Sequence, residues 1–286
     1  MQSFSNTLFA DADSAYLDAE YGIFGVPFDG TTSFKAGTRD APAAVRQASY
    51  NLETYMPYYD LELPDIPFFD MGDLYAECLP DIVVGQVEDV VSDLVKDGKI
   101  PVMIGGEHSI TIGAVRALRP VWYVVCDAHL DMQDEYRGSR FNHDCVTARV
   151  SEVTENIIII GARSGCKEEF ARARENYHLF TADEIRNRGM QSVLNEVSDL
   201  IGDEPVYLSI DADSIDCCLT PGLGTPEPFG LTPADIRDVI RKVAKNAVGF
   251  DYVEVLPNDS GQTALVAAHL IREFIAGHSC ALKQTD

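Results

Sequence analysis

Two short motifs with alternating acidic residues are the part of this chain best suited to chemistry. DAHLD occupies positions 127–131 after the apolar run 121–126, and SIDAD occupies positions 209–213 after the run 205–208. Alternate side chains of an extended chain point to the same side. Each motif therefore presents carboxylates, joined in the first by an imidazole, at the end of a buried strand. This spacing predicts divalent metal ions held in one cleft.

A third motif supplies another histidine. GGEHS, at positions 105–109, follows the apolar run 101–105 and precedes a predicted helix, so His108 is expected to face the same cleft. Together the motifs offer two imidazoles and four carboxylates: His108, Asp127, His129, Asp131, Asp211 and Asp213. This hard, oxygen-rich set contains no thiolate and suits Mn²⁺ better than it suits structural zinc.

The charges of these ligands predict how many metal ions they hold. Four carboxylates at contact raise one another's pKa, so they stay ionised together only beside cations. Two divalent ions would offset the negative charge, and six residues can serve two ions only if some carboxylates bridge. Bridging implies ions roughly 3.5–4 Å apart, and such a pair lowers the pKa of a shared water molecule. The predicted chemistry is therefore hydrolysis.

The motifs require strands that end at one edge of a sheet. Apolar, β-rich runs alternate with amphipathic helices, and strands are predicted at residues 22–26, 67–71, 101–105, 121–126, 156–161, 206–210 and 248–255, with a weaker one at 178–180. Clear helices are predicted at 81–99, 232–246 and 263–276. Strands that are apolar on both faces indicate a parallel sheet covered on both sides. We predict one α/β domain over residues 1–286, with three α/β/α layers and a mainly parallel sheet of roughly eight strands.

The composition restricts the partners and the compartment. The formal net charge of −24 opposes binding to nucleic acid and to anionic membranes, whereas it would attract a cationic substrate. No run approaches the length of a membrane-spanning helix, and the N-terminus lacks the pattern of a secretory signal. Seven cysteines in such a chain predict reduced thiols. We predict a cytoplasmic protein that binds neither nucleic acid nor membrane.

Further motifs follow one another along the chain: GVPFDG (25–30), GTRDAP (37–42), DMGD (70–73), PGLGTPEP (221–228) and DYVEVLP (251–257). With the three motifs above, in this order, they resemble the ureohydrolases, the family of arginases and agmatinases, and specifically its agmatinase branch. The resemblance covers nearly the whole chain. It implies an arginase-like fold, two Mn²⁺ ions per subunit, a small cationic guanidino substrate and a homo-oligomer, either a trimer or a hexamer.

The resemblance also implies a role for each site residue. One manganese ion would be bound by His108, Asp127, Asp131 and Asp211, and the other by Asp127, His129, Asp211 and Asp213, so Asp127 and Asp211 would bridge. Asp131 would also orient the attacking hydroxide. Glu254 matches the acid that holds the substrate guanidinium, a planar cation that pairs well with carboxylates. His143 matches the loop histidine that transfers a proton to the leaving amine, which is worth roughly 10²–10⁴-fold in rate.

Substrate choice is expected to depend on the segment after DAHLD. Arginases typically continue with groups that bind the amino-acid end of arginine, whereas MQDE (132–135) and a lone Asn142 follow here. The acidic segment should repel a carboxylate and attract a second cation. The predicted reaction is hydrolysis of agmatine to putrescine and urea, for polyamine biosynthesis. The alternatives are aminopropylagmatine, guanidinobutyrate or another guanidino acid, arginine or formimidoylglutamate as substrate, or a non-catalytic homologue.

Other polar residues near the motifs are interpreted as structural. Asp216 and Arg163 are expected to hold loops at the cleft, and His178, His269 and His278 lie in ordinary helical or strand contexts. The chain departs from the usual family pattern, without touching a proposed ligand, at these positions: Glu107, Asp144, Cys145, Cys217 and Phe229. The departures lie around the predicted cleft mouth, so they bear on substrate choice more than on the chemistry.

Overall fold

A parallel sheet of eight strands forms the centre of the computed structural model, which describes residues 7–283. The strands lie in the order β4-β1-β5-β10-β9-β6-β7-β8, and every neighbouring pair is parallel. Their bounds are β1 (Tyr21–Val26), β4 (Phe68–Asp73), β5 (Ile100–Gly105), β6 (Trp122–Cys126), β7 (Asn156–Ile160), β8 (His178–Phe180), β9 (Val206–Asp211) and β10 (Ala247–Val253). A short antiparallel pair, β2 (Tyr55–Met56) and β3 (Leu61–Glu62), lies outside this sheet.

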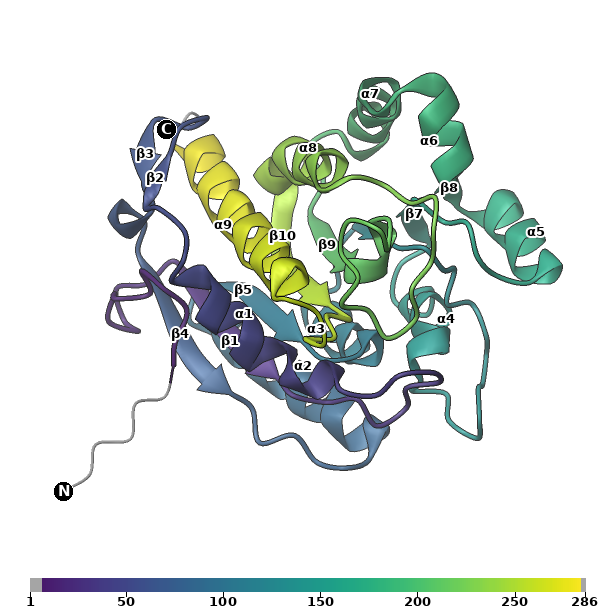
Figure 1. The fold of residues 1–286 in the computed structure, drawn as a ribbon, viewed down its shortest axis with the longest axis horizontal. Helices are drawn as coiled ribbons and strands as arrows, with labels where there is room; N and C mark the ends of the chain where they lie inside the picture. The colour runs from purple at the N-terminus through teal and green to yellow at the C-terminus, as the bar shows by residue number, and fades with distance from the viewer. Residues whose placement is uncertain (1–6, 284–286) are drawn as a thin grey trace.

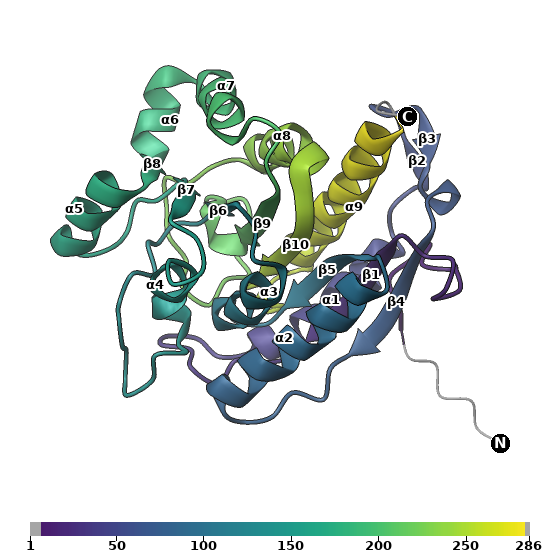
Figure 2. The same cartoon turned by 180° about the vertical axis from the view of Figure 1, so that it is seen from behind.

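Helices cover both faces of the sheet. One layer consists of α1 (Ala41–Ser49), α8 (Pro233–Val243) and α9 (Gln262–Leu282), which Figure 1 shows in front of the strands. The opposite layer consists of α2 (Pro80–Lys96), α3 (Thr111–Leu118) and α4 (Val146–Val150), which face the viewer in the reversed view of Figure 2. Helices α5 (Lys167–Asn176), α6 (Ala182–Arg188) and α7 (Met190–Ile201) lie beside the β7–β8 edge (Figure 1). The predicted three-layer α/β fold with a parallel sheet is confirmed.

Burial on both faces explains why the strands are continuously hydrophobic. In β6, Trp122 and Val124 belong to the apolar cluster beneath α8 and α9, whereas Tyr123 and Val125 belong to the cluster beneath α2 and α3. All the side chains of this strand are buried. A large apolar side chain contributes roughly 1.5–3 kcal/mol when fully buried, so each layer of helices stabilises the face that it covers.

The differences from the predicted elements lie at their ends. The strand predicted at 248–255 ends at Val253, because Glu254 adopts the left-handed conformation with φ 63°. The helix predicted at 81–99 ends at Lys96 and is followed by Gly98 with φ 72°, a typical glycine after a helix. The last helix extends beyond the predicted 263–276 to Leu282. Tertiary packing extends it, since its later turns are buried against the sheet.

Candidate metal centre

Four neighbouring strands at the middle of the sheet carry the candidate residues at their carboxyl ends. In the order β5, β10, β9 and β6, these strands are followed or ended by His108, Glu254, Asp211 and Asp127. Because the strands are parallel, all four carboxyl ends lie at one edge, where α/β sheets usually bind ligands. Residues distant in the sequence are thereby brought together at that edge.

A first group of ligand atoms gathers around His108. Its Nδ1 lies 3.3 Å from Asp127 Oδ2, 3.2 Å from Asp131 Oδ2 and 3.3 Å from Asp211 Oδ2. The imidazole is 2% exposed, and Nδ1 has no hydrogen-bond partner among the described residues. A buried nitrogen that faces three carboxylate oxygens requires a positive charge between them. The donor set of one imidazole and three carboxylates fits a hard divalent ion.

A second group lies beside the first and shares Asp127 with it. His129 Nδ1 lies 3.0 Å from Asp213 Oδ2 and 3.6 Å from Asp127 Oδ1. Asp127 therefore turns one carboxylate oxygen toward each histidine, as expected of a bridging ligand. Asp211 is placed differently: its Oδ2 belongs to the first group, while its Oδ1 accepts a hydrogen bond from the backbone N–H of Asp213. Bridging by Asp211 stays a prediction.

The pKa shifts of the carboxylates in the two groups also indicate that positive charge is needed there. Burial and the charge of Asp127 raise the pKa of Asp131 to about 8. Burial and the neighbouring Asp213 raise the pKa of Asp211 well above its ordinary value. Burial also favours the neutral form of Asp127, but its interactions with the neighbouring His108 and His129 hold its pKa below the ordinary value. The carboxylates cannot all ionise without added positive charge. The residues present thus fit metal ions.

A hydrogen-bond network holds the ring of His108 at Nε2, the nitrogen that does not face the three carboxylates. Its Nε2 lies 3.1 Å from Ser209 Oγ, which donates a 2.6 Å hydrogen bond to Asp251 Oδ1. Asp251 is fully buried and also accepts hydrogen bonds from the hydroxyls of Thr111 and Tyr207. Partners behind a ligand of this kind orient the ring toward the metal. Sequence reasoning missed this network, although Ser209 precedes Asp211 by two residues and so shares its side of the strand.

The second glycine of GGEHS, Gly106, is required by close packing. A Cβ on Gly106 would lie 1.9 Å from the carbonyl oxygen of Phe28, so only glycine fits there. The adjacent Glu107 is buried and accepts hydrogen bonds from the backbone N–H and the hydroxyl of Thr31. Thr31 Oγ1 in turn lies 3.1 Å from His143 Nδ1. Glu107, where the chain departs from the family pattern, is therefore linked through Thr31 to His143. It connects the loop of His143 to the loop of His108.

The six candidate ligands lie beside a cleft of about 120 Å³. Its lining residues are Ser33, His108, His129, Asp131, Tyr136, His143, Asp144, Asp211, Asp213, Thr225 and Glu254. Asp127 lies just behind them, buried at 3% exposure. The predicted residues are therefore all at this cleft, whereas its lining by Ser33, Tyr136 and Thr225 was not predicted. These three come from loops whose positions depend on the fold.

Glu254 and His143 differ in charge and in partners. Glu254 Oε1 accepts a 2.8 Å hydrogen bond from the backbone N–H of His108, and no ion pair reaches it among residues 7–283. Burial and the charge of Glu107 raise the pKa of Glu254 well above its ordinary value, so a bound cation would be favourable. Burial and the positive His129 lower the pKa of His143 to about 4. His143 is therefore neutral at pH 7.

The acidic segment after DAHLD does not supply the charge of the cleft wall. Met132 is buried, and Asp134 pairs with Arg140 and Arg149 outside the cleft lining. The acid that lines the cleft from this loop is Asp144. The sequence interpretation correctly located acidic character in this loop but assigned it to the wrong residues, because the pairing arginines are recognisable only in three dimensions.

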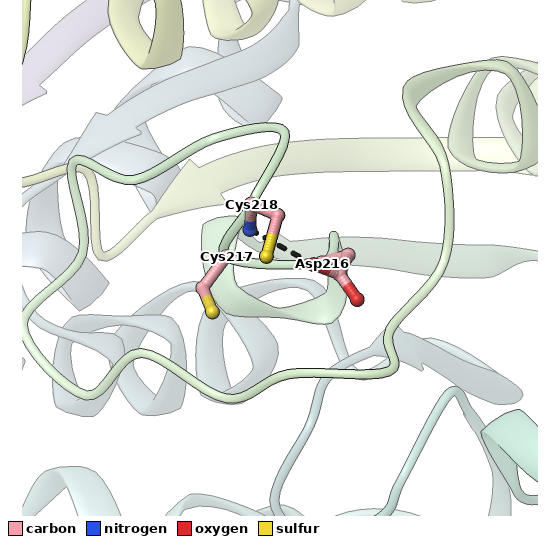
Figure 3. Close-up of side chains that lie close together, drawn as sticks. All are labelled: Asp216, Cys217 and Cys218. Atoms are coloured by element: carbon pink, nitrogen blue, oxygen red, sulfur yellow. Dashed lines mark hydrogen bonds between the residues drawn. The ribbon is translucent and has the colours of Figure 1, made fainter.

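Arg163 and Asp216 hold the loops at the cleft, as the sequence indicated. Arg163 donates hydrogen bonds to the carbonyl oxygens of Gly161, Asp213, Ser214, Glu227 and Pro228. Asp216 accepts hydrogen bonds from the backbone N–H groups of Cys218 (2.8 Å) and Gly230 (3.0 Å), the first of which Figure 3 shows. Asp216, Cys217 and Cys218 have ligand atoms within 4.8 Å of one another, but they lie outside the cleft lining.

The hydrogen bonds of Arg163 predict a measurable effect on stability. Replacing it with Ala should lower the free energy of unfolding by about 2–4 kcal/mol, since several carbonyl oxygens of the 213–228 loop lose a charged donor. Urea denaturation followed by circular dichroism measures this change. The exposed Arg172 on α5 is the matched control, and its Ala variant should unfold within about 0.5 kcal/mol of wild type. Equal midpoints for the two variants would contradict the role of Arg163.

The remaining histidines lie away from this cleft, and no cysteine lines it. His178, His269 and His278 are absent from the cleft lining, and His278 Nδ1 pairs instead with the hydroxyl of Tyr21 at 2.8 Å. All seven cysteines lie within the described residues and have free thiols, as predicted. Over residues 7–283, no helix combines the length and the apolar character needed to cross a membrane.

Comparison with known proteins agrees with this fold. The sequence profile of the Arginase family matches residues 19–277. The N(1)-aminopropylagmatine ureohydrolase of Thermococcus kodakarensis is 42% identical over 88% of both chains, and the agmatinase of Pyrococcus horikoshii is 38% identical over 92% of this chain and 93% of its own. The crystal structure of the agmatine ureohydrolase of Thermoplasma volcanium superposes with a TM-score of 0.94, at 40% identity, over 99% of this chain and 98% of that one.

The fold and the grouped ligands therefore define a metal-dependent α/β hydrolase. The chain belongs to the arginase family. Within it, the protein is a ureohydrolase, an enzyme that hydrolyses the C–N bonds of linear amidines.

Proposed function

We propose that this ureohydrolase cleaves agmatine to putrescine and urea. The observation that carries the proposal is the cleft lining, which contains no Lys or Arg among the described residues and keeps Glu254 and Asp144 as acids beyond the proposed metal ligands Asp131, Asp211 and Asp213. Arginine, guanidinobutyrate and formimidoylglutamate each carry a carboxylate, which the acids of the lining would repel. Agmatine carries a second cation in place of a carboxylate, and such a cleft attracts it. The names of the agmatinase relatives support the same choice.

We further propose that His108, Asp127, His129, Asp131, Asp211 and Asp213 bind two Mn²⁺ ions. The unpartnered Nδ1 of His108 and the two oxygens of Asp127 support this assignment. When bound, such a pair of ions activates water as a nucleophile at neutral pH. The six side chains would hold the ions beside the cleft that the substrate enters.

The remaining roles are assigned to side chains at the cleft. Glu254 holds the guanidinium, and Asp131 orients the attacking water toward the guanidinium carbon. A new C–O bond forms at that carbon, and its bond to the alkyl-bearing nitrogen breaks. The leaving nitrogen must take up a proton. His143, which is neutral at pH 7 and lies within 3.2 Å of the hydroxyls of Thr31 and Ser33, relays that proton.

A substrate panel tests the proposal. Manganese-loaded protein is expected to release urea from agmatine with the highest kcat/KM, and to act at least tenfold more slowly on guanidinobutyrate and arginine, whose carboxylates the cleft repels. Urea is measured colorimetrically, with chelator-treated protein as the blank. A higher kcat/KM for either guanidino acid would refute the agmatine assignment.

Aminopropyl-extended agmatine is the second candidate substrate, favoured by the 42% identity to a relative named for it. It belongs in the same panel, because it differs from agmatine only in a longer cationic tail. A kcat/KM for this compound above that for agmatine would replace the first proposal with the second. A cytoplasmic location and assembly into a trimer or hexamer stay predictions from the sequence.

A further inference from the structure

One acid on the cleft wall has no assigned role in the chemistry. Asp144 lies in the 3-10 turn His143–Cys145, is half-buried, and lines the cleft together with Glu254 and the candidate ligands. Among residues 7–283, no hydrogen bond and no ion pair within 4 Å reaches its carboxylate.

The backbone around Asp144 holds this carboxylate in place. The N–H of Asp144 donates a 3.2 Å hydrogen bond to Oδ1 of the buried Asn142, and its carbonyl oxygen accepts a 3.1 Å hydrogen bond from the N–H of Gln133. Helix α4 begins two residues later, at Val146. The position of the acid is therefore determined by both ends of the loop.

Two other acids close to this loop are already compensated. Asp134 pairs with two arginines, and Glu169 accepts hydrogen bonds from the backbone N–H groups of Met132 and Cys166. Asp144 has no such partner. Burial and the charge of Glu169 raise its pKa to about 6, which means that its charged form is destabilised as the protein stands. A cation placed beside it would remove that cost.

We propose that Asp144 forms a second cation subsite, which binds the ammonium group at the far end of a guanidino-alkylamine. This inference rests on the proposed function and adds the residue that recognises the substrate tail. Glu254 is nearly inaccessible at 7% exposure, whereas Asp144 is half-buried, so the two acids lie at different depths of one cleft. A substrate with a cation at each end can pair with both.

The subsite distinguishes substrates by their tails. A tail with an ammonium group gains an ion pair, an uncharged alkyl tail gains none, and a tail with a carboxylate meets a like charge. The aromatic ring of Tyr136, which contacts His143 edge-on in the same lining, offers an apolar surface to the methylene chain between the ends. The preference therefore arises from the tail and is separate from cleavage of the guanidinium group.

The experiment compares agmatine with butylguanidine, which has the same guanidinium and a similar chain without the ammonium. In wild type, kcat/KM for agmatine should exceed that for butylguanidine, and Asp144→Asn should lower this ratio about tenfold, mainly through KM for agmatine. Asp134→Asn is the matched control, since it makes the same change in the same loop at a residue 77% exposed and outside the cleft lining. The ratio in this control should equal the wild-type ratio.

Three results would overturn the inference. An unchanged ratio in Asp144→Asn would show that the ammonium binds elsewhere. An equal fall for both substrates would assign Asp144 to the support of His143. A loss of bound manganese, measured by atomic emission, would assign it to the metal site. If wild type releases urea from no guanidine at all, the proposed function itself fails. That outcome is distinguishable from failure of the subsite alone, in which wild type is active but the ratio does not depend on Asp144.

Discussion

Asp127→Asn is expected to abolish urea release and to leave the protein unable to hold two manganese ions. Asp127 turns Oδ2 toward His108 and Oδ1 toward His129, so each oxygen serves one ligand group. Asn has a single oxygen, and its NH₂ group is a donor that cannot bind a metal ion. The variant can therefore complete only one of the two groups. Activation of water by two metal ions lowers the activation barrier by several kcal/mol, and each 1.36 kcal/mol corresponds to a factor of ten in rate. We therefore expect a loss of roughly 10⁴-fold or more in kcat.

Metal content and activity have to be measured on the same samples. Wild type is expected to contain two manganese ions per protomer by atomic emission, and Asp127→Asn one or fewer at the same free manganese concentration. Far-UV circular dichroism establishes that the variant is folded. Asp183→Asn on α6 is the control, because this side chain is 84% exposed and distant from the ligands. An Asp127→Asn enzyme with two ions and full activity would refute the bridging assignment.

Glu254→Gln is expected to lower kcat/KM for agmatine by about 10²–10³-fold while leaving the metal ions bound. Gln has the same shape and can still accept the hydrogen bond from the backbone N–H of His108 through its amide oxygen. It loses the negative charge that faces the substrate guanidinium in a buried site. Removal of one partner from such a charge pair costs 2–5 kcal/mol.

Metal content separates the two possible roles of Glu254. A carboxylate that binds substrate can be neutralised without loss of manganese, whereas one whose negative charge helps to hold the metal ions cannot. The exposed Glu168 on α5 is the matched control, since its Gln variant makes the same chemical change at a distance from the cleft. Retention of full kcat/KM in Glu254→Gln, or loss of manganese from it, would exclude the guanidinium-binding role.

The fold was predictable to the extent that it depends on local pattern. The strands at 121–126 and 206–210 are continuous apolar runs, and in the structure they are β6 and β9 with an end shifted by at most one residue. A parallel sheet followed from their burial on both faces. The strand predicted to run through residue 255 was wrong at its end, because the left-handed conformation of Glu254 is imposed by its tertiary contacts.

The ligand set was predictable from residue type and position, but the predicted alternation of an extended chain is wrong for both motifs, because β6 ends at Cys126, Asp131 is left-handed with φ 51° and Ala212–Ser214 form a 3-10 turn. Asp127, His129 and Asp131 are recognisable from their residue types and their position after an apolar run. The structure places each of them at the cleft or directly behind it. The order of strands was not predictable from spacing. β5, β10, β9 and β6 are neighbours in the sheet although β10 and β9 follow β6 by many residues in the chain.

The sequence by itself determined the chemistry of this protein, since residue type and position after an apolar run are enough to specify hard oxygen and nitrogen ligands at strand ends. Only the tertiary structure decided which acids are free to meet a substrate. Asp134 and Asp144 are equally acidic in the sequence, but Arg140 and Arg149 pair with the first, and no side chain of residues 7–283 forms an ion pair with the second. Pairing between charges depends on distances across loops, and those distances are set by how the chain packs and are not encoded in local spacing.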